Sequence, residues 1–416
     1  MRGECDLKRS HGPIIATQAD PFHLFSSFGI DGLAMQDGNQ KFTVETEPDP
    51  EQLALLQLNL TNGLGPRLQS LLLNYFGNAQ EIFAASGSEL LQVEGIGPKV
   101  SVQITRGRQM EEATREWEEC RATGTQLIFR SSSLYPASLH ETHDPPPVLY
   151  VRGDLQEQDL LAVGIVGARQ CTHYGRTQAA RFASQLAQAG VTIISGLARG
   201  IDAAAHRGAL EAHGRTIAVC APGLAQIYPP EHRGLADEII HSGAIMTESP
   251  LRRTALRGLF PQRNRIIAGL SLGVLIVEAT RQSGALHTAR HAMEQGRDVF
   301  ALPGRIDSPA SAGCHDLIRD GAMLVRSVDD ILESLGPSVR PVNVGEKTVV
   351  AVARELNLND QERAVLNLID FAPTAIDTVL TGAGMEFSRV LSTLTVLEMR
   401  KLVRRLPGSF VERMNS

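Results

Sequence analysis

The sequence has few of the features that mark several large protein classes. Its five cysteines lie far apart in 416 residues and form no Cys-x-x-Cys pair, so neither a disulfide framework nor a zinc knuckle is expected. Basic residues do not exceed acidic ones: 40 Lys and Arg stand against 46 Asp and Glu, a formal net charge of −6. Binding to nucleic acid through overall basicity is thereby excluded, and any such site must be a local basic cluster.

Long apolar runs are also absent. The longest apolar run without a charge, residues 266–277, has 12 residues and is too short to span a bilayer. The N-terminus lacks the apolar core that a signal peptide needs. Together with the lack of a disulfide framework, these absences predict a cytoplasmic protein that does not engage a membrane.

The composition that remains is that of an ordinary globular protein. Hydrophobic residues make up 43% and charged residues 21%. At about 150 residues per domain, the length predicts roughly three domains. We expect a loosely ordered tail, a small helical domain of helix-hairpin-helix or SAM-like type, an α/β core, a linker and a winged-helix domain, over residues 1–48, 49–120, 121–336, 337–347 and 348–416.

The core alternates regularly between strand and helix patterns. Its expected strands are residues 148–151, 161–166, 191–195, 216–220, 244–247, 274–277 and 299–302. Helical patterns separate them, notably over 177–189, 203–213 and 285–295. Near-continuous Val and Ile are typical of strands buried on both faces, and the alternation predicts a doubly wound, mainly parallel sheet.

Each flanking domain carries one weaker signal. In the helical domain, Gly95, Gly97 and Lys99 lie in a Gly-x-Gly-Pro-Lys segment that is typical of a helix-hairpin-helix turn. Backbone N–H groups of such a turn can contact a DNA phosphate, but the turn can equally serve packing alone. At the C-terminus, three helical patterns and a hairpin over 402–411 predict a winged helix, whose basic residues fit ordinary surface charge best.

Glycine and arginine recur where the core strands end. In an open α/β sheet, ligands bind beyond the carboxyl ends of the strands. Glycines allow close approach of an anion, and arginines and free helix N-termini attract it. One such segment could be only a turn, but three in one sheet favour a phosphate site. The candidate phosphate-binding residues at these ends are Gly167, Arg169, Ser195, Gly196, Arg199, Gly200, Ser283 and Gly284.

A local basic stretch completes the candidate site. Residues 249–277 contain five arginines and no acid, with Arg263, Asn264 and Arg265 just before a very apolar helix. In a chain of negative net charge, this stretch suits a phosphate backbone. The alternative is a solvated arginine-rich loop.

No pattern of catalytic or metal-binding residues can be defended. The chain has no Walker A motif, and no Gly-x-Gly-x-x-Gly follows the first core strand. His287 and His291 have the helical spacing of a metal pair but lack a third ligand. Asp202 and His206 fit helix capping and packing as well as acid–base chemistry, with Asp202 expected as the N-cap. We therefore expect no catalytic residue, no metal and no cofactor.

The order and spacing of core motifs are similar to one family. The motifs occupy residues 164–169, 174–175, 195–202, 205–206, 216–219, 228–229, 260–271, 277–279, 283–286, 301–304 and 320–322. In this order they resemble the bacterial DNA-processing protein A family (DprA, also called Smf). The likeness covers about 160–330, and the flanking domains resemble accessory domains of that family with weaker motifs.

The resemblance implies an extended Rossmann-like core that binds single-stranded DNA without sequence preference. It also implies a homodimer that protects incoming strands and helps load the recombinase RecA during natural transformation and recombination, without catalysis. Arg199 stands where relatives often have Lys, which keeps the charge. Six other residues differ from those usual in the family, a difference that affects the expected ligand contacts and not the expected fold. They are Ala168, Cys220, Ala225, His232, His287 and His315.

A second hypothesis comes from enzymes of similar fold. Some small proteins with such a sheet hydrolyse the bond between base and sugar of a nucleoside monophosphate, and the same phosphate site would suit a free nucleotide. Glu278, beside the Ser283-Gly284 turn, would then be the catalytic carboxylate. The arginine-rich stretch and the two flanking domains favour a polymer over a single nucleotide.

Overall fold

A computed structural model describes residues 47–336, 365–369, 374–383, 385, 387–399, 402–406 and 410–413. The expected tail, apart from its last two residues, and the expected linker lie outside these residues, as does most of the first helix expected in the C-terminal domain. Within the described parts of the chain, no helix is both long enough and apolar enough to cross a membrane.

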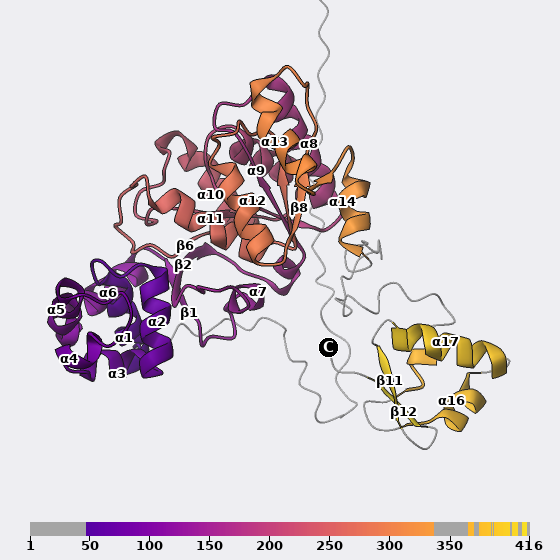
Figure 1. Cartoon of the computed structure of the whole chain (residues 1–416), viewed down its shortest axis with the longest axis horizontal. Coiled ribbons are helices and arrows are strands. Elements are labelled where there is room, and N and C mark those ends of the chain that lie inside the picture. Colours follow the sequence, from indigo (N-terminus) through magenta and orange to yellow (C-terminus); the bar gives the residue numbers. More distant parts are fainter. Residues whose placement is uncertain are drawn as a thin grey trace, which may run out of the picture. The chain divides into compact units, whose positions relative to one another are not determined.

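A nine-stranded sheet forms the centre of the core (Figure 1). Its order is β1-β2-β6-β5-β4-β3-β7-β8-β9, and neighbours are parallel except that β2 runs antiparallel to β1 and β6. The predicted mainly parallel α/β sheet is therefore confirmed. The strands are β1 Gln126–Phe129, β2 Val148–Gly153, β3 Ala162–Val166, β4 Thr192–Ser195, β5 Thr216–Val219, β6 Ala244–Thr247, β7 Gly273–Ile276, β8 Asp298–Ala301 and β9 Met323–Leu324.

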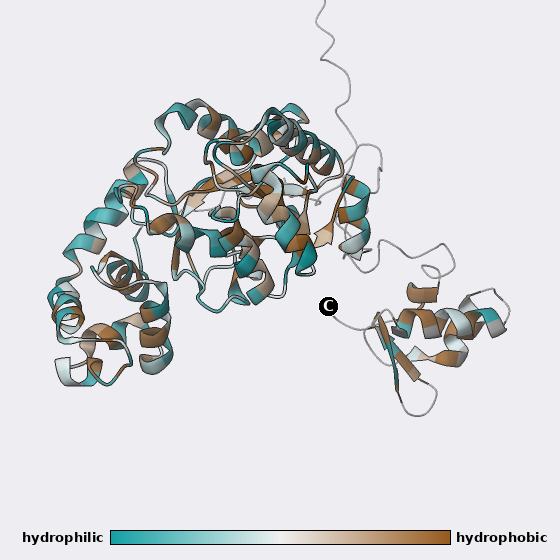
Figure 2. Cartoon of the chain, turned by 45° about the horizontal axis from the view of Figure 1, so that its top comes forward, coloured by the Kyte–Doolittle hydropathy of each residue, from teal (hydrophilic) through white to brown (hydrophobic). Residues whose placement is uncertain are grey.

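Helices cover both faces of this sheet. Val163 and Ile165 of β3 pack in one apolar cluster with α8 and α9, whereas Ala162 and Val166 pack in another with α11 and α12. This division follows from the alternation of side chains along a strand, and Figure 2 shows hydrophilic and hydrophobic residues alternating along these helices. The helices are α7 Ala137–His140, α8 His173–Gln188, α9 Ile201–Glu211, α10 Arg233–Ser242, α11 Leu259–Leu270, α12 Ala285–Glu294, α13 Ala312–Arg319 and α14 Val328–Ser334.

Six helices precede the sheet and form the helical domain. They are α1 Pro50–Leu60, α2 Pro66–Phe76, α3 Ala79–Ala84, α4 Gly87–Leu90, α5 Pro98–Arg106 and α6 Glu111–Ala122. Asp49 starts α1 with a capping box, since its carboxylate accepts a hydrogen bond from the Gln52 N–H (2.7 Å). By contrast, α2 and α5 both begin after a Gly-x-Gly-Pro turn and have no side-chain cap.

The helical domain and the core share a packed boundary. The Glu116 carboxylate accepts a hydrogen bond from the backbone N–H of Leu251 (2.6 Å), and the Asn59 amide donates to the carbonyl of Glu248 (3.0 Å). Leucines of α1 also belong to the same apolar cluster as Tyr150 of β2. The two parts therefore meet through both polar and apolar contacts.

The C-terminal domain, taken by itself, has a three-stranded sheet and two described helices. The strands lie in the order β10-β12-β11, and Val379, Val390, Leu394 and Val411 lie in its apolar core. Two of the three expected helical patterns are present as helices, and the two strands of the expected hairpin pair with each other. The elements are β10 Thr374–Ala375, α16 Ile376–Gly382, α17 Phe387–Met399, β11 Val403–Leu406 and β12 Phe410–Arg413.

Two local expectations need correction. Asp202 is not the N-cap of α9: the cap is Gly200, whose φ of 80° suits glycine, and Asp202 lies in the first turn. The arginine-rich stretch is also only partly a loop: Arg252, Arg253 and Arg257 lie in an exposed segment before α11, but residues 263–265, expected before the helix, do not. Because α11 begins at Leu259, Arg263 and Arg265 are helical and buried.

Candidate functional site

Two loops meet at the carboxyl edge of the sheet. The loop after β3 carries Gly167 and Arg169, and the loop after the neighbouring strand β4 carries Arg199 and Gly200. They touch directly, because the N–H of Ile201 donates to the carbonyl of Ala168 (3.3 Å) and a side chain at Gly200 would collide with that carbonyl. Glycine at these positions allows the loops to pack closely, which brings both arginines to one edge.

Arg169 and Arg199 are exposed and lie beside aromatic rings. The Arg169 guanidinium carbon is 4.7 Å from the centroid of Phe260, whose ring is 5.7 Å from that of Tyr228. Among the described residues, no ion pair or side-chain hydrogen bond holds Arg169. We call Arg169, Arg199, Tyr228 and Phe260 the arginine–aromatic cluster. It offers cations to phosphates and ring faces to bases.

Arg199 already has an acidic partner. Its Nε lies 2.5 Å from Oε1 of Glu231, and both side chains are about half exposed. The hydrogen bond to Glu231 raises the pKa of Arg199, and the same bond lowers the pKa of Glu231. A phosphate that binds Arg199 therefore has to compete with Glu231.

Ser195, Gly196 and Arg263 lie beneath the cluster. The Ser195 hydroxyl is fully buried and donates to the carbonyl of Ile165 (2.6 Å). The buried Arg263 guanidinium donates to the carbonyls of Gly196 (2.7 Å) and Val219, and a side chain at Gly196 would collide with it. These groups join the ends of neighbouring strands and do not face solvent.

The remaining predicted residues of the core also serve as supports. Arg265 forms a buried ion pair with Glu248, and the Asn264 amide donates to the carbonyl of Gly284 (3.2 Å). Gly284 precedes α12, where the Ser283 hydroxyl accepts a hydrogen bond from the Ala285 N–H (3.3 Å). The structure does not bring these side chains to the surface beside Arg169.

Glu278 fills the place where a nucleotide phosphate would be expected. β3 lies between β4 and β7, the point at which such sheets bind nucleotides at the N-terminus of the next helix. Here the buried Glu278 carboxylate accepts hydrogen bonds from the N–H (2.9 Å) and hydroxyl (2.6 Å) of Thr172, the N-cap of α8. The α8 N-terminus is thus occupied by the protein's own anion.

Asp202 and His206 form part of the same buried layer. Burial raises the pKa of Asp202, while the charge of Arg263 opposes that shift, and Asp202 accepts a hydrogen bond from the N–H of Ala198 (3.3 Å). Burial lowers the pKa of His206 to about 3, so its ring is neutral, with Nδ1 2.7 Å from the Thr216 hydroxyl. Both residues have structural partners and neither is exposed.

The candidate turn of the helical domain is a separate feature. Gly95 has a φ of 86°, Gly97 is the N-cap of α5, and Lys99 is exposed in its first turn. The structure places this turn on the helical domain, whereas the arginine–aromatic cluster belongs to the core. In the described regions, no group of three His, Cys, Asp or Glu side chains is arranged to hold a metal ion.

Sequence reasoning missed the aromatic half of the cluster and its acid. Tyr228 and Phe260 lie 32 residues apart and no periodic pattern connects them, although each stands before a proline within a motif noted above. No sequence pattern indicated that Glu231 belongs to the site. Two departures from the family pattern also have partners: His232 Nδ1 lies 2.9 Å from the Leu197 carbonyl, and His315 Nε2 lies 3.1 Å from the Gly304 carbonyl.

A Rossmann-like sheet with arginines and aromatic rings at its carboxyl edge, followed by a winged helix, defines a class of DNA-binding protein. A family model for DNA recombination-mediator protein A matches residues 126–336, and one for the DprA winged helix domain matches 351–409. The chain belongs to this DprA/Smf family.

Individual relatives agree with that assignment. The chain is 35% identical to Protein Smf of Synechocystis over 87% of this chain and 99% of the relative. It is 40% identical to Protein Smf of Escherichia coli K12 over 68% and 76%. It is also similar to the X-ray structure of DNA processing protein A from Streptococcus pneumoniae, with a TM-score of 0.60 and 35% identity over 68% of this chain and 97% of that one.

Proposed function

We propose that this protein binds single-stranded DNA through the arginine–aromatic cluster, protects incoming strands and helps load RecA during natural transformation and recombination. It does so in the cytoplasm, as a homodimer, without catalysis and without a cofactor. The observation that carries the DNA-binding step is the pairing of exposed Arg169 and Arg199 with the exposed Tyr228 ring and with Phe260. The dimer and RecA rest on the family resemblance.

The chemistry of the cluster favours a single strand over a duplex. Guanidinium groups bind phosphates whatever the sequence, and aromatic rings stack on any base that is free of a partner base. In a duplex, the bases are stacked on one another and their faces are hidden. We therefore expect binding with little sequence preference.

The residues divide into contacts and supports. Arg169 and Arg199 contact phosphates, while the glycines at 167, 196 and 200 let their loops pack. Ser195 and Arg263 hold the strand ends beneath those loops through buried hydrogen bonds. Asn264, Arg265, Ser283 and Gly284 support the neighbouring α11 and the start of α12. Gly95, Gly97 and Lys99 provide a weaker phosphate contact on the helical domain.

The hydrolase hypothesis has less support. Its catalytic carboxylate would be Glu278, but both oxygens of this carboxylate accept hydrogen bonds from Thr172. The carboxylate also occupies the helix N-terminus at which a free nucleotide would place its phosphate. A phosphate there would meet a buried negative charge. We expect no release of base from nucleoside monophosphates.

The test measures binding of labelled single and duplex oligonucleotides across a salt series. Arg169→Ala and Arg199→Ala are each expected to weaken single-strand binding for every sequence and to flatten the plot of log affinity against log salt by about 0.7 per lost contact. Arg115→Ala is the matched control, since this exposed arginine pairs with Glu111 on the helical domain. Equal affinity for single and duplex DNA, or an unchanged slope in both variants, would refute the proposal.

A further inference from the structure

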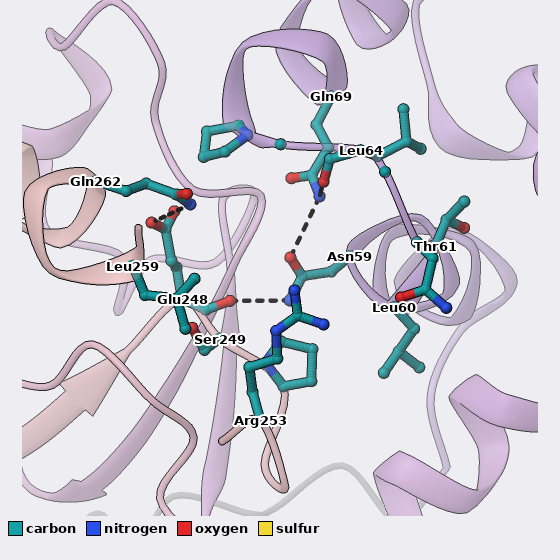
Figure 3. Close-up of a pocket in the computed structure, with 15 residues that line it drawn as sticks. Asn59, Leu60, Thr61, Leu64, Gln69, Glu248, Ser249, Arg253, Leu259 and Gln262 are labelled. Carbon is teal, nitrogen blue, oxygen red and sulfur yellow. Dashed lines mark hydrogen bonds between the residues drawn. The ribbon is translucent and has the colours of Figure 1, made fainter. Parts of the chain in front are cut away.

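A polar hollow lies between the helical domain and the core (Figure 3). Its volume is about 240 Å³. The helical domain contributes Asn59, Gln69 and the turn between α1 and α2, and the core contributes Glu248, Arg253 and Gln262. Ligand sites often form at such domain boundaries. The hollow is small for a drug-sized molecule and suits one nucleotide unit.

The polar groups of the hollow are held in place. The Asn59 amide donates to the Glu248 carbonyl (3.0 Å) and accepts from Gln69 (3.4 Å), and Gln262 donates to the Glu248 carboxylate (3.0 Å). Amide side chains carry both donors and acceptors, so the groups they leave free can bond the edge of any base. The wall is thus preorganised and tolerant of sequence.

The net charge of the hollow is positive. Glu248 is the one acid among its described lining residues, and its ion pair with Arg265 neutralises it. Arg253 is exposed and forms no ion pair or side-chain hydrogen bond with the parts of the chain that the structure describes. Its backbone is fixed, since its N–H donates to the Pro250 carbonyl (2.8 Å) and its carbonyl accepts from Gly223 (2.9 Å). A phosphate is the natural partner for such an arginine.

One helical turn separates this hollow from the arginine–aromatic cluster. Leu259 and Gln262, at the start of α11, line the hollow, and Phe260 between them contacts Arg169. A strand whose phosphate is bound at Arg169 can therefore reach the hollow by passing over this one turn.

We propose that the hollow is a second subsite for single-stranded DNA, in which Arg253 binds a phosphate and the amides of Asn59, Gln69 and Gln262 face the adjoining base. This inference rests on the proposed function and adds a contact that involves the helical domain. In this proposal, one DNA strand contacts the arginine–aromatic cluster on one side of the first turn of α11 and the hollow on the other side. A duplex cannot enter, because the space holds a single nucleotide.

The test compares strand lengths. Oligothymidylates of about 4 and about 16 nucleotides, spanning the usual range for one binding domain, are titrated against the full chain and Arg253→Ala. We expect the variant to bind the long strand about three- to tenfold more weakly, with a salt slope lower by about 0.7, and to bind the short strand as before. Arg253→Lys should recover most of the long-strand affinity, because the charge remains.

Arg252→Ala is the matched control. Its guanidinium is also exposed but is paired with Glu119 (2.8 Å), so both strand lengths should bind it normally. Unchanged long-strand binding by Arg253→Ala, or an equal loss on both lengths, would overturn the subsite. If neither Arg253→Ala nor Arg169→Ala changes DNA affinity, the proposed function itself is contradicted. If only Arg169→Ala lowers the affinity, the proposed function stands and the subsite is contradicted.

A second measurement does not depend on any variant. A long strand that carries 4-thiothymidine is irradiated in complex with the full chain, and the attached peptides are mapped. Crosslinks within residues 59–69 or 248–253 are expected, and a fivefold excess of thymidine monophosphate over the strand should not suppress them. Crosslinks confined to other peptides, or full suppression by the free nucleotide, would overturn a subsite that recognises the strand.

Discussion

The arginines at the carboxyl edge of the sheet fall into two layers that the sequence presents alike. Arg169 and Arg199 stand above the edge with exposed guanidinium groups, and Phe260 and Glu231 are their neighbours. Arg263 and Arg265 are less than one-tenth exposed; Arg263 donates to backbone carbonyls and Arg265 pairs with Glu248 through their terminal nitrogens. Cations of one layer are free to meet a ligand, and those of the other hold the loops.

This difference shows what decides the role of an arginine near glycine. A buried guanidinium without partners would be very unfavourable, so Arg263 and Arg265 can exist only because carbonyls and a carboxylate surround them. The exposed pair needs no such support and can exchange partners. The buried layer should therefore control stability, and the exposed layer should control affinity and its dependence on salt.

The largest expected effect is that of removing Arg263. Arg263→Ala leaves two buried carbonyls without donors and Asp202 without its nearby positive charge. We expect the free energy of unfolding to fall by about 3–5 kcal/mol, measured by urea denaturation of the full chain. Arg169→Ala is the control, and its stability should change by less than about 0.5 kcal/mol. An Arg263→Ala variant as stable as the native chain would contradict the assignment of the buried arginines to stability.

The next effect is a loss of stability in mild acid. Burial, with the charge of Arg263 adding to it, lowers the pKa of His206 from 6.5 to about 3 in the folded chain. Between pH 6.5 and 3, His206 is therefore protonated in the unfolded chain and neutral in the folded chain. The free energy of unfolding is fully present above pH 6.5 and decreases as the pH falls from 6.5 to 3. At about 1.4 kcal/mol per pH unit, the loss from pH 6.5 to 5 is about 2 kcal/mol.

His206→Gln isolates this effect. The variant keeps Asp202, whose raised pKa acts in the opposite direction because the folded carboxyl takes up its proton first. Unfolding of both proteins is measured between pH 7.5 and 5. The native chain should lose more stability than the variant over that range, and parallel pH profiles would contradict the pKa assigned to His206.

The sequence predicted the architecture well because the strands of the core are buried on both faces. Runs of Val and Ile placed β3 to β8 within about one residue of their observed ends. It failed on β1 and α10, neither of which was recognised. It also placed residues 260–265 before α11, although proline, here Pro261, is well tolerated in the first turn of a helix.

The site was less predictable than the fold. Glycine and arginine at strand ends located the right edge, since parallel strands all end there. Nothing in the sequence distinguishes Arg169 from Arg263, because burial depends on which helix face meets the sheet. Similarly, the carboxylate of Glu278 looked free for catalysis until Thr172, more than 100 residues away in the chain, was seen to bond it.

The smallest expected effect tests the exposed layer most directly. Arg199 must leave Glu231 before it can bind a phosphate, and a surface ion pair of this kind is weak and screened by salt. Glu231→Gln removes the competitor and a repulsive charge, so affinity for single-stranded DNA should rise by about two- to threefold at low salt. The number of neutralised phosphates does not change, so the salt slope should stay close to that of the native chain.

In an Arg199→Ala background, the same change should have a smaller effect on DNA affinity, because only the repulsion between Glu231 and the DNA remains to be relieved. An equal gain with and without Arg199 would show that Glu231 acts on the DNA alone, and Arg199 would then leave the list of phosphate contacts.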